Sequence, residues 1–216
     1  MKNIVVLISG RGSNLEALLR TAEEERWREQ LGAAITAVIS NRADAAGLEI
    51  ARDSGIPTRV VDHTAFTTRD DFDRALADEI DHLRPAVVVL AGFMRVLTPQ
   101  FVRRYAGRLI NIHPSLLPAF PGLRTHERAL DAGVRVHGAT VHFVSDEVDA
   151  GGIIAQAAVL VRPGDDAPTL AARVLAQEHR LLPRSVRLVL EDRVRWDHGR
   201  VVTADVAAAE LAWWAS

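Results

Sequence analysis

Residues 3–22 read NIVVLISGRGSNLEALLRTA, and this stretch decides the fold. The run from Ile4 to Ile8 is an unbroken series of β-branched residues and leucine, which is typical of a parallel strand buried on both faces. Beyond a glycine-containing turn, apolar residues recur at helical spacing on one face: Leu15, Leu18, Leu19 and Ala22. The stretch therefore predicts a buried strand, a tight turn and an amphipathic helix, which is the opening unit of an α/β sheet.

The same alternation continues along the first half of the chain. Further strand-like runs cover residues 34–39, 58–61, 86–90 and 109–112. Helix-like runs lie between them, at 45–53, on an apolar stripe that begins at Phe72, and after Thr98-Pro99, where proline suits a first helical turn. This rhythm predicts an α/β protein with a doubly wound, mostly parallel sheet. Two later strand-like runs, 140–144 and 153–161, are expected as antiparallel edge strands.

The C-terminal part of the chain has a different pattern. Apolar residues between Leu170 and Val186 predict a long helix, in which Pro183 is a candidate kink. Residues 194–202 read as a small hairpin that turns at 197–199. We expect residues 1–190 to form the main domain and residues 191–216 to form a hairpin and tail, packed on that domain or trailing it. The pattern of the tail, which contains Trp213 and Trp214, predicts nothing about its role.

Composition excludes several classes of protein. The chain has 216 residues, with 26 Lys and Arg against 28 Asp and Glu, a formal charge of −2 and no basic block. A nucleic-acid surface usually needs clustered basic residues, so we expect no nucleic-acid partner. The chain has no cysteine, which excludes disulfides and a thiol nucleophile. Its N-terminal apolar run is too short for a signal peptide, and no run is long enough to span a membrane. The cytoplasm is the expected compartment.

The first candidate site is the turn from Ser9 to Asn14, which follows the first strand and begins a helix. Free N–H groups and the helix dipole make such a turn suitable for an anion, and glycine allows a ligand close to the backbone. The spacing matches neither a dinucleotide fingerprint nor a Walker A motif, so a single phosphate on a small substrate fits best. The alternative is an ordinary turn in which Ser13 or Asn14 caps the helix.

The second candidate is Asn111 with His113, at the end of the strand 109–112. Residues two apart in a strand face the same side, and open α/β sheets place their sites at the carboxyl ends of parallel strands. An amide can donate to a developing oxyanion, and an imidazole beside it can move a proton near neutral pH. The alternative is a structural pair that holds the following loop by hydrogen bonds.

The third candidate is Asp149, in the acidic, glycine-containing segment 144–152. A carboxylate near a histidine favours the charged form of the ring. The alternatives are a solvated acidic turn and, less well supported, a cation site, because the segment lacks EF-hand spacing. His137 and His142 lie in or beside a strand, where a structural role is the more common one. No His, Asp and Glu residues have the spacing of a zinc site, so no metal is expected.

Five ordered segments carry a family resemblance: VVLISGRGSNL (5–15), VVVLAGFMRVLTP (87–99), LINIHPSLLPAFPG (109–122), HGATVHFVSDEVDAGGIIAQ (137–156) and AARVLAQEH (171–179). Together they resemble the folate-dependent glycinamide ribonucleotide formyltransferase family. The similarity covers roughly residues 3–182, and the last two segments are far more specific than a lone glycine-rich turn. The resemblance implies a formyltransferase fold, with the N-terminal half of residues 1–190 binding the ribonucleotide phosphate and the C-terminal half supplying folate-binding and catalytic loops. No segment after about residue 190 matches, so nothing is carried over there.

The resemblance also implies roles for individual residues. The implied catalytic trio is Asn111, His113 and Asp149. The implied ribonucleotide site comprises Gly12, Ser13, Asn14, Leu175, Ala176, Gln177 and Glu178. The implied folate site comprises Arg69, Met94, Arg95, Val96, Leu97, Asn111, Ser145, Asp146, Glu147, Val148 and Asp149.

The implied reaction is transfer of a formyl group from 10-formyltetrahydrofolate, as co-substrate, to the amine of glycinamide ribonucleotide, in purine synthesis. We expect small-molecule substrates, no membrane or nucleic-acid partner, and a monomer or homodimer. A methionyl-tRNA formyltransferase would be expected to carry an extra C-terminal RNA-binding domain, and a formyltetrahydrofolate hydrolase an extra N-terminal regulatory domain. A phosphate-sensing module without catalytic activity is the alternative from another class, but it leaves the trio unexplained.

Overall fold

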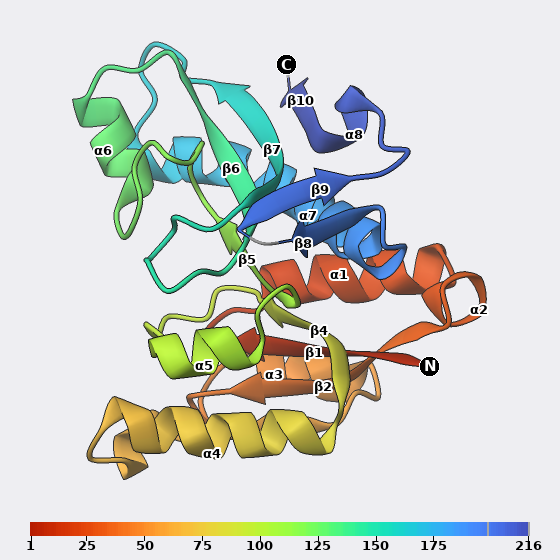
Figure 1. The fold of residues 1–216 in the computed structure, drawn as a ribbon. Coiled ribbons are helices and arrows are strands. Elements are labelled where there is room, and N and C mark those ends of the chain that lie inside the picture. Colours follow the sequence, from red (N-terminus) through yellow and green to blue (C-terminus); the bar gives the residue numbers. More distant parts are fainter. Residues whose placement is uncertain (198, 216) are drawn as a thin grey trace.

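A computed structural model describes residues 1–197 and 199–215. Its main feature is an eight-stranded sheet with the strand order β10-β7-β6-β5-β4-β1-β2-β3 (Figure 1). The strands of this sheet are β1 (Lys2–Ile8), β2 (Ala33–Ser40), β3 (Thr58–Val60), β4 (Pro85–Leu90), β5 (Leu109–His113), β6 (Val136–Phe143), β7 (Ile153–Leu160) and β10 (Ala212–Ala215). A separate hairpin pairs β8 (Val194–Asp197) with β9 (Arg200–Thr203), and residue 198 of the expected turn lies outside the described residues.

The helices are α1 (Ser13–Glu24), α2 (Trp27–Gln30), α3 (Gly47–Asp53), α4 (Arg69–His82), α5 (Pro99–Arg104), α6 (Thr125–Asp131), α7 (Ala167–Leu190) and α8 (Ala208–Leu211), with a 3-10 turn, η1 (His63–Ala65). Helices follow at the predicted places after β1, β2, β3, β4 and β7, and α2, α6 and α8 are additional short helices. α7 continues through Pro183 to Leu190. Within the described residues no helix is both long enough and apolar enough to cross a membrane.

The central strands of the sheet are buried on both faces, which confirms a doubly wound α/β fold. Ile4, Val6 and Ile8 pack into one apolar core, together with residues of α1, α3 and α7. Val5 and Leu7 point to the other face and pack with residues of α4 and α5. Figure 1 shows these two helical layers on opposite sides of the sheet. The continuous apolar run of β1 is the local cause, because a strand with two buried faces needs an apolar residue at every position.

The sheet is mostly parallel, and β6 is the strand that runs against its neighbours. β6 pairs antiparallel with β5 on one side and with β7 on the other. β10 then adds to β7 in parallel, so the tail supplies one edge of the sheet, at the top in Figure 1. The antiparallel pairing of β5 with β6 matters for the site, because it sets residues from the end of β5 directly opposite residues of β6.

Candidate active site

Two of the expected residues, Asn111 and His113, lie on β5 and face a histidine and a threonine of β6. The register pairs Asn111 with His142 and His113 with Thr140. The Nδ2 atom of Asn111 lies 3.2 Å from Nε2 of His142. The Nδ1 atom of His142 lies 2.9 Å from the carbonyl oxygen of Phe143, to which it can only donate. The Nε2 atom of His142 is then the acceptor of a hydrogen bond from Asn111.

This hydrogen bond fixes which atoms Asn111 presents. Burial lowers the pKa of His142, and the carbonyl oxygen of Phe143 and the carboxylate of Asp149 only partly oppose that shift. A neutral ring with its proton on Nδ1 keeps Nε2 available as an acceptor. The amide of Asn111 therefore uses one N–H on His142, and its second N–H remains available to donate.

His113 is held between two oxygen atoms. Its side chain is 7% exposed, its Nε2 atom lies 3.0 Å from the carbonyl oxygen of Phe120, and its Nδ1 atom lies 3.4 Å from Oδ2 of Asp149. Both ring nitrogens can donate at once only when the ring is doubly protonated. The two oxygen atoms therefore fix the orientation of the ring.

Asp149 reaches His113 because the segment between β6 and β7 folds back toward the end of β5. The backbone of Asp149 is left-handed, with φ at 55°, and its side chain is 10% exposed. The backbone N–H of Gly122 donates to Oδ2 at 2.7 Å, and Oδ1 lies 3.8 Å from Nε2 of His142. The three residues expected to form the trio thus gather in one mostly buried cluster, with His142 as a fourth member.

The loop after His113 is attached to the strands beneath it. The hydroxyl of Thr140 donates to the carbonyl oxygen of Ser115 at 2.7 Å and accepts from the N–H of Leu117 at 3.0 Å. The amide of Gln156 donates to the carbonyl oxygen of Leu117 at 2.9 Å. These bonds fix the backbone that leads to Phe120, whose carbonyl oxygen orients the His113 ring. The alternative for Asn111 and His113 is a structural pair that holds this loop by hydrogen bonds. The loop is indeed held by hydrogen bonds, but mainly by those of Thr140 and Gln156.

The expected phosphate loop lies at the start of α1. Gly12 precedes the helix with φ at 83°, and no side chain caps the helix. The capping alternative is therefore wrong for Ser13 and Asn14, and the first N–H groups of α1 are not taken up by a capping side chain. A Cβ atom on Gly12 would lie 2.5 Å from the Cα atom of Gly47, so this glycine is required by space as well as by conformation.

Asn14 connects this loop to α7. Its Nδ2 atom donates to Oε2 of Glu178 at 2.7 Å, and both side chains are buried. Burial raises the pKa of Glu178, and the hydrogen bond from Asn14 partly opposes that shift. Two segments separated by more than 160 residues in the sequence therefore meet beside the loop. Leu175 is half-buried and Ala176 is exposed, both in the turn of α7 that precedes Glu178.

The residues expected to bind folate lie in three places. Met94 and Val96 expose 69% and 54% of their surface, whereas Leu97 is buried. The Met94 N–H donates to the Ser9 hydroxyl at 2.7 Å, which ties this segment to the turn that begins the phosphate loop. The guanidinium of Arg95 lies over the ring of Phe72.

Four of the other expected folate residues, Arg69, Asp146, Glu147 and Val148, are exposed. In the segment 145–149, Asp146 forms an ion pair with Arg103 at 2.6 Å, Glu147 is exposed, and Val148 is 53% exposed. The hydroxyl of Ser145 donates to the carbonyl oxygen of Glu147. Arg69 is exposed at the first turn of α4.

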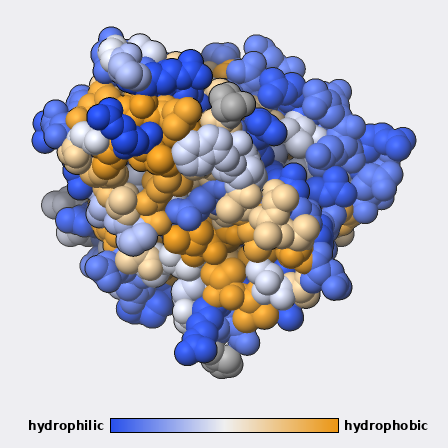
Figure 2. All heavy atoms as spheres, turned by 90° about the horizontal axis from the view of Figure 1, so that it is seen from above, coloured by the Kyte–Doolittle hydropathy of each residue, from blue (hydrophilic) through white to orange (hydrophobic). Residues whose placement is uncertain are grey.

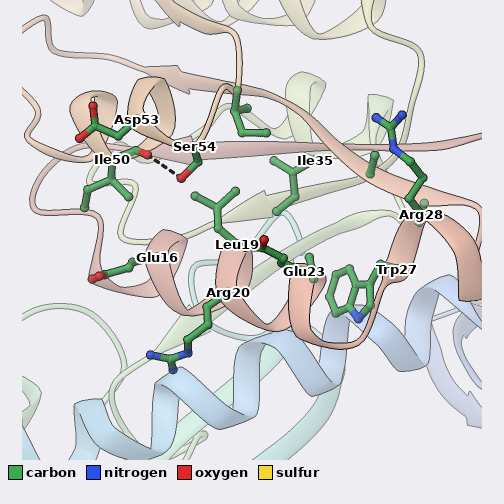
Figure 3. A pocket seen from close by; sticks show the side chains of 14 residues that line it. Glu16, Leu19, Arg20, Glu23, Trp27, Arg28, Ile35, Ile50, Asp53 and Ser54 are labelled. Atoms are coloured by element: carbon green, nitrogen blue, oxygen red, sulfur yellow. Dashed lines mark hydrogen bonds between the residues drawn. The ribbon is translucent and has the colours of Figure 1, made fainter.

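A separate hollow, with a volume of 630 Å³, lies between α1, β2 and α3 (Figure 3). Its lining is apolar at Ile35 and Ile50 and charged at Glu16 and Arg20. None of the expected site residues lines it. Its lining includes carboxylates but neither a histidine nor an asparagine, unlike the cluster around His113. Among residues 1–197 and 199–215, no group of three or more His, Cys, Asp or Glu side chains is placed to hold a metal ion.

Sequence reasoning missed His142, Thr140 and Gln156. His142 was expected to be structural, yet it is in contact with both Asn111 and Asp149. His142 is brought to the site by the β5–β6 register, which places it opposite Asn111. Local pattern does not reveal a register between two strands that are joined by a long connection.

Comparison with known proteins identifies the class to which this fold and site belong. A model of the formyl transferase family matches residues 2–186, and the chain belongs to that family. Within it, the chain belongs with the phosphoribosylglycinamide formyltransferases. It is 48% identical to the Escherichia coli (strain K12) phosphoribosylglycinamide formyltransferase over 214 residues, which cover 96% of this chain and 99% of that one.

Solved structures give the same assignment. The phosphoribosylglycinamide formyltransferase of Coxiella burnetii is 45% identical, with a TM-score of 0.88 and coverage of 99% of this chain and 98% of that one. The glycinamide ribonucleotide transformylase 1 of Symbiobacterium toebii is also 45% identical, with a TM-score of 0.89 and 95% of both chains covered. The chain is likewise 48% identical to part of the trifunctional purine biosynthetic protein adenosine-3 of Bos taurus, covering 94% of this chain but only 20% of that protein.

Proposed function

We propose that this formyltransferase moves the formyl group of 10-formyltetrahydrofolate to the amine of glycinamide ribonucleotide, yielding formylglycinamide ribonucleotide and tetrahydrofolate in purine synthesis in the cytoplasm. The observation that supports it most directly is the mostly buried cluster of an amide, an imidazole and a carboxylate at the end of β5. Family membership supplies the reaction class, and this cluster supplies groups that suit it.

The chemistry assigned to Asn111 and His113 follows from transfer between two nitrogens. The substrate amine attacks the formyl carbon, and the carbonyl oxygen becomes an oxyanion in a tetrahedral intermediate. The free N–H of Asn111 donates to that oxygen, and His113 donates to it through Nδ1, whose 3.4 Å contact with Asp149 is the longer of the two ring contacts. The intermediate collapses when the bond from the formyl carbon to the folate nitrogen breaks.

Proton transfer completes the reaction. A proton leaves the attacking amine, and one must reach the departing folate nitrogen. His113 is the proposed carrier, because its ring is held in place by the carbonyl oxygen of Phe120 and its Nδ1 atom faces a carboxylate. Asp149 stabilises the charged ring by the proximity of an opposite charge. Holding both substrates in attack geometry supplies a further part of the acceleration.

Substrate binding is assigned to the two ends of the site. The N-terminal half of residues 1–190 holds the ribonucleotide phosphate through residues 12–14, with the turn 175–178 of α7 beside it. The buried hydrogen bond from Asn14 to Glu178 supports this pairing. The folate is assigned to Arg69, to residues 94–97 and to residues 145–149, together with Asn111. The exposed apolar side chains of Met94, Val96 and Val148 offer a surface suited to an aromatic ring system. We assign the hairpin and tail of residues 191–216 to the same domain.

The test is a spectrophotometric assay. Purified protein mixed with both substrates should release the deformylated folate, which is followed by its absorbance, and turnover should require the ribonucleotide. Release of formate without the ribonucleotide would identify a hydrolase instead. Binding of the ribonucleotide without any turnover would identify a sensor and would contradict the proposal.

A further inference from the structure

The C-terminal tail contacts the helix that carries part of the proposed ribonucleotide site. β10 pairs in parallel with β7, which sets Trp213 opposite Ala157 and Trp214 opposite Ala158. The two tryptophans are consecutive in a strand, so their side chains point to opposite faces. Trp213 is half-buried, whereas Trp214 is 53% exposed. Figure 2 views this end of the molecule, where apolar residues are exposed between charged ones.

Trp213 is held by one face of α7. Its Nε1 atom donates to Oε1 of Gln177 at 3.1 Å, and the guanidinium carbons of Arg180 and Arg184 lie 5.8 and 6.0 Å from its ring centroid. Gln177, Arg180 and Arg184 are three and seven residues apart, which places them on the same side of a helix. The cations lie within the distance at which an indole ring attracts them.

The segment before β10 is anchored independently of the tryptophan. Glu210 of α8 forms ion pairs with Arg193 at 2.8 Å and with Arg184 at 3.4 Å. It also accepts from the N–H of Ala207 at 3.0 Å. The tail is therefore fixed to α7 through Glu210 as well as through Trp213. A conservative substitution of Trp213 leaves the contacts of Glu210 in place.

The hydrogen bond from Trp213 determines how the Gln177 amide is oriented. A glutamine amide can rotate by half a turn, which exchanges an acceptor for a donor at each position. An indole N–H only donates, so it must face Oε1. Arg180 also approaches that oxygen, at 3.5 Å. With Oε1 facing two donors, the NH₂ group of Gln177 is directed elsewhere, as a donor.

Gln177 precedes Glu178, which is bonded to Asn14 of the phosphate loop. We propose that Trp213 is a positioning residue for the ribonucleotide: its indole N–H holds the Gln177 amide so that the NH₂ group donates to an oxygen of the bound ribonucleotide. This inference rests on the proposed function, because it assumes that Gln177 contacts that substrate. It gives the tail a role in substrate affinity that the sequence pattern of the tail does not predict.

The experiment compares Trp213→Phe with Trp214→Phe, which makes the same chemical change on the exposed face of the strand. Binding of glycinamide ribonucleotide is measured by calorimetry, and kcat and both KM values are measured by absorbance. Trp213→Phe keeps a ring between the arginines but loses the donor, so we expect the ribonucleotide Kd to rise about 3- to 10-fold, the scale of one hydrogen bond. The folate KM and kcat should stay within about twofold, and Trp214→Phe should match the wild type.

A double-mutant cycle with Gln177→Ala separates positioning from general stability. If Trp213 acts through Gln177, the effect of Trp213→Phe on the ribonucleotide Kd disappears in the Gln177→Ala background, even if both variants melt at a lower temperature. The inference is overturned if the effect persists there, or if Trp213→Phe leaves the Kd unchanged while Gln177→Ala raises it. An unchanged Kd in Gln177→Ala would instead refute the assignment of Gln177 within the proposed site, and the inference with it. Loss of ribonucleotide-dependent turnover in the wild type would refute the function itself.

Discussion

Replacing Gly12 with alanine tests whether the turn before α1 is built around a missing side chain. The new Cβ atom would lie 2.5 Å from the Cα atom of Gly47, which is backbone and cannot rotate away. The φ angle of 83° adds a second cost, because an L-residue in the left-handed region loses about 1–2 kcal/mol. Overpacking typically costs a further 1–3 kcal/mol or so. We therefore expect Gly12→Ala to lower the free energy of unfolding by about 2–5 kcal/mol.

Gly10→Ala is the matched control from the same turn. A Cβ atom there would meet nothing within 4 Å, and the residue has no positive φ. Urea denaturation followed by circular dichroism gives the free energy of unfolding of both variants. Gly12→Ala should also melt several degrees lower than Gly10→Ala, at roughly 2–4 °C per kcal/mol for a chain of this size. Equal stability of the two variants would refute the argument that the close approach of Gly12 and Gly47 shapes this turn.

Three further perturbations test the cluster around His113 and the buried pair beside the phosphate loop. His113→Ala should lower kcat by roughly 10²-fold or more, the range of general acid–base catalysis, while calorimetry shows ribonucleotide binding nearly intact; a wild-type rate would remove His113 from the chemistry. Asp149→Asn should slow turnover, because the charged ring of His113 loses the opposite charge beside it; a wild-type rate would count against this role. For Glu178, burial raises the pKa in the folded state above its ordinary 4.5. Its contribution to stability is therefore complete below about pH 4.5 and is lost as the pH rises through the raised folded value. Glu178→Gln does not lose that contribution, so its stability relative to the wild type should increase as the pH rises above 4.5 in urea denaturation; a difference that is independent of pH would contradict this.

Local sequence determined the elements of the sheet and their burial. The run from Ile4 to Ile8 needs two buried faces, and the structure divides it between two cores. Helix spacing placed α1, α4 and α7, because a 3.6-residue period reflects contact with one surface. The alternation of strands and helices was enough to give the doubly wound arrangement, since parallel strands need crossover helices. Asn111 and His113 could be paired from sequence because they are only two residues apart in one strand.

Contacts between distant segments were decided only by tertiary structure. His142 meets Asn111 because of the antiparallel register of β5 and β6, and a shift of one residue would turn it to the other face. Asp149 meets His113 because its segment folds back through a left-handed residue. Asn14 meets Glu178, and Trp213 meets Gln177, only when α7 packs between the first helix and the tail. The physical reason is the same in each case: a local pattern records which face of an element is buried, but not which distant residue lies against it.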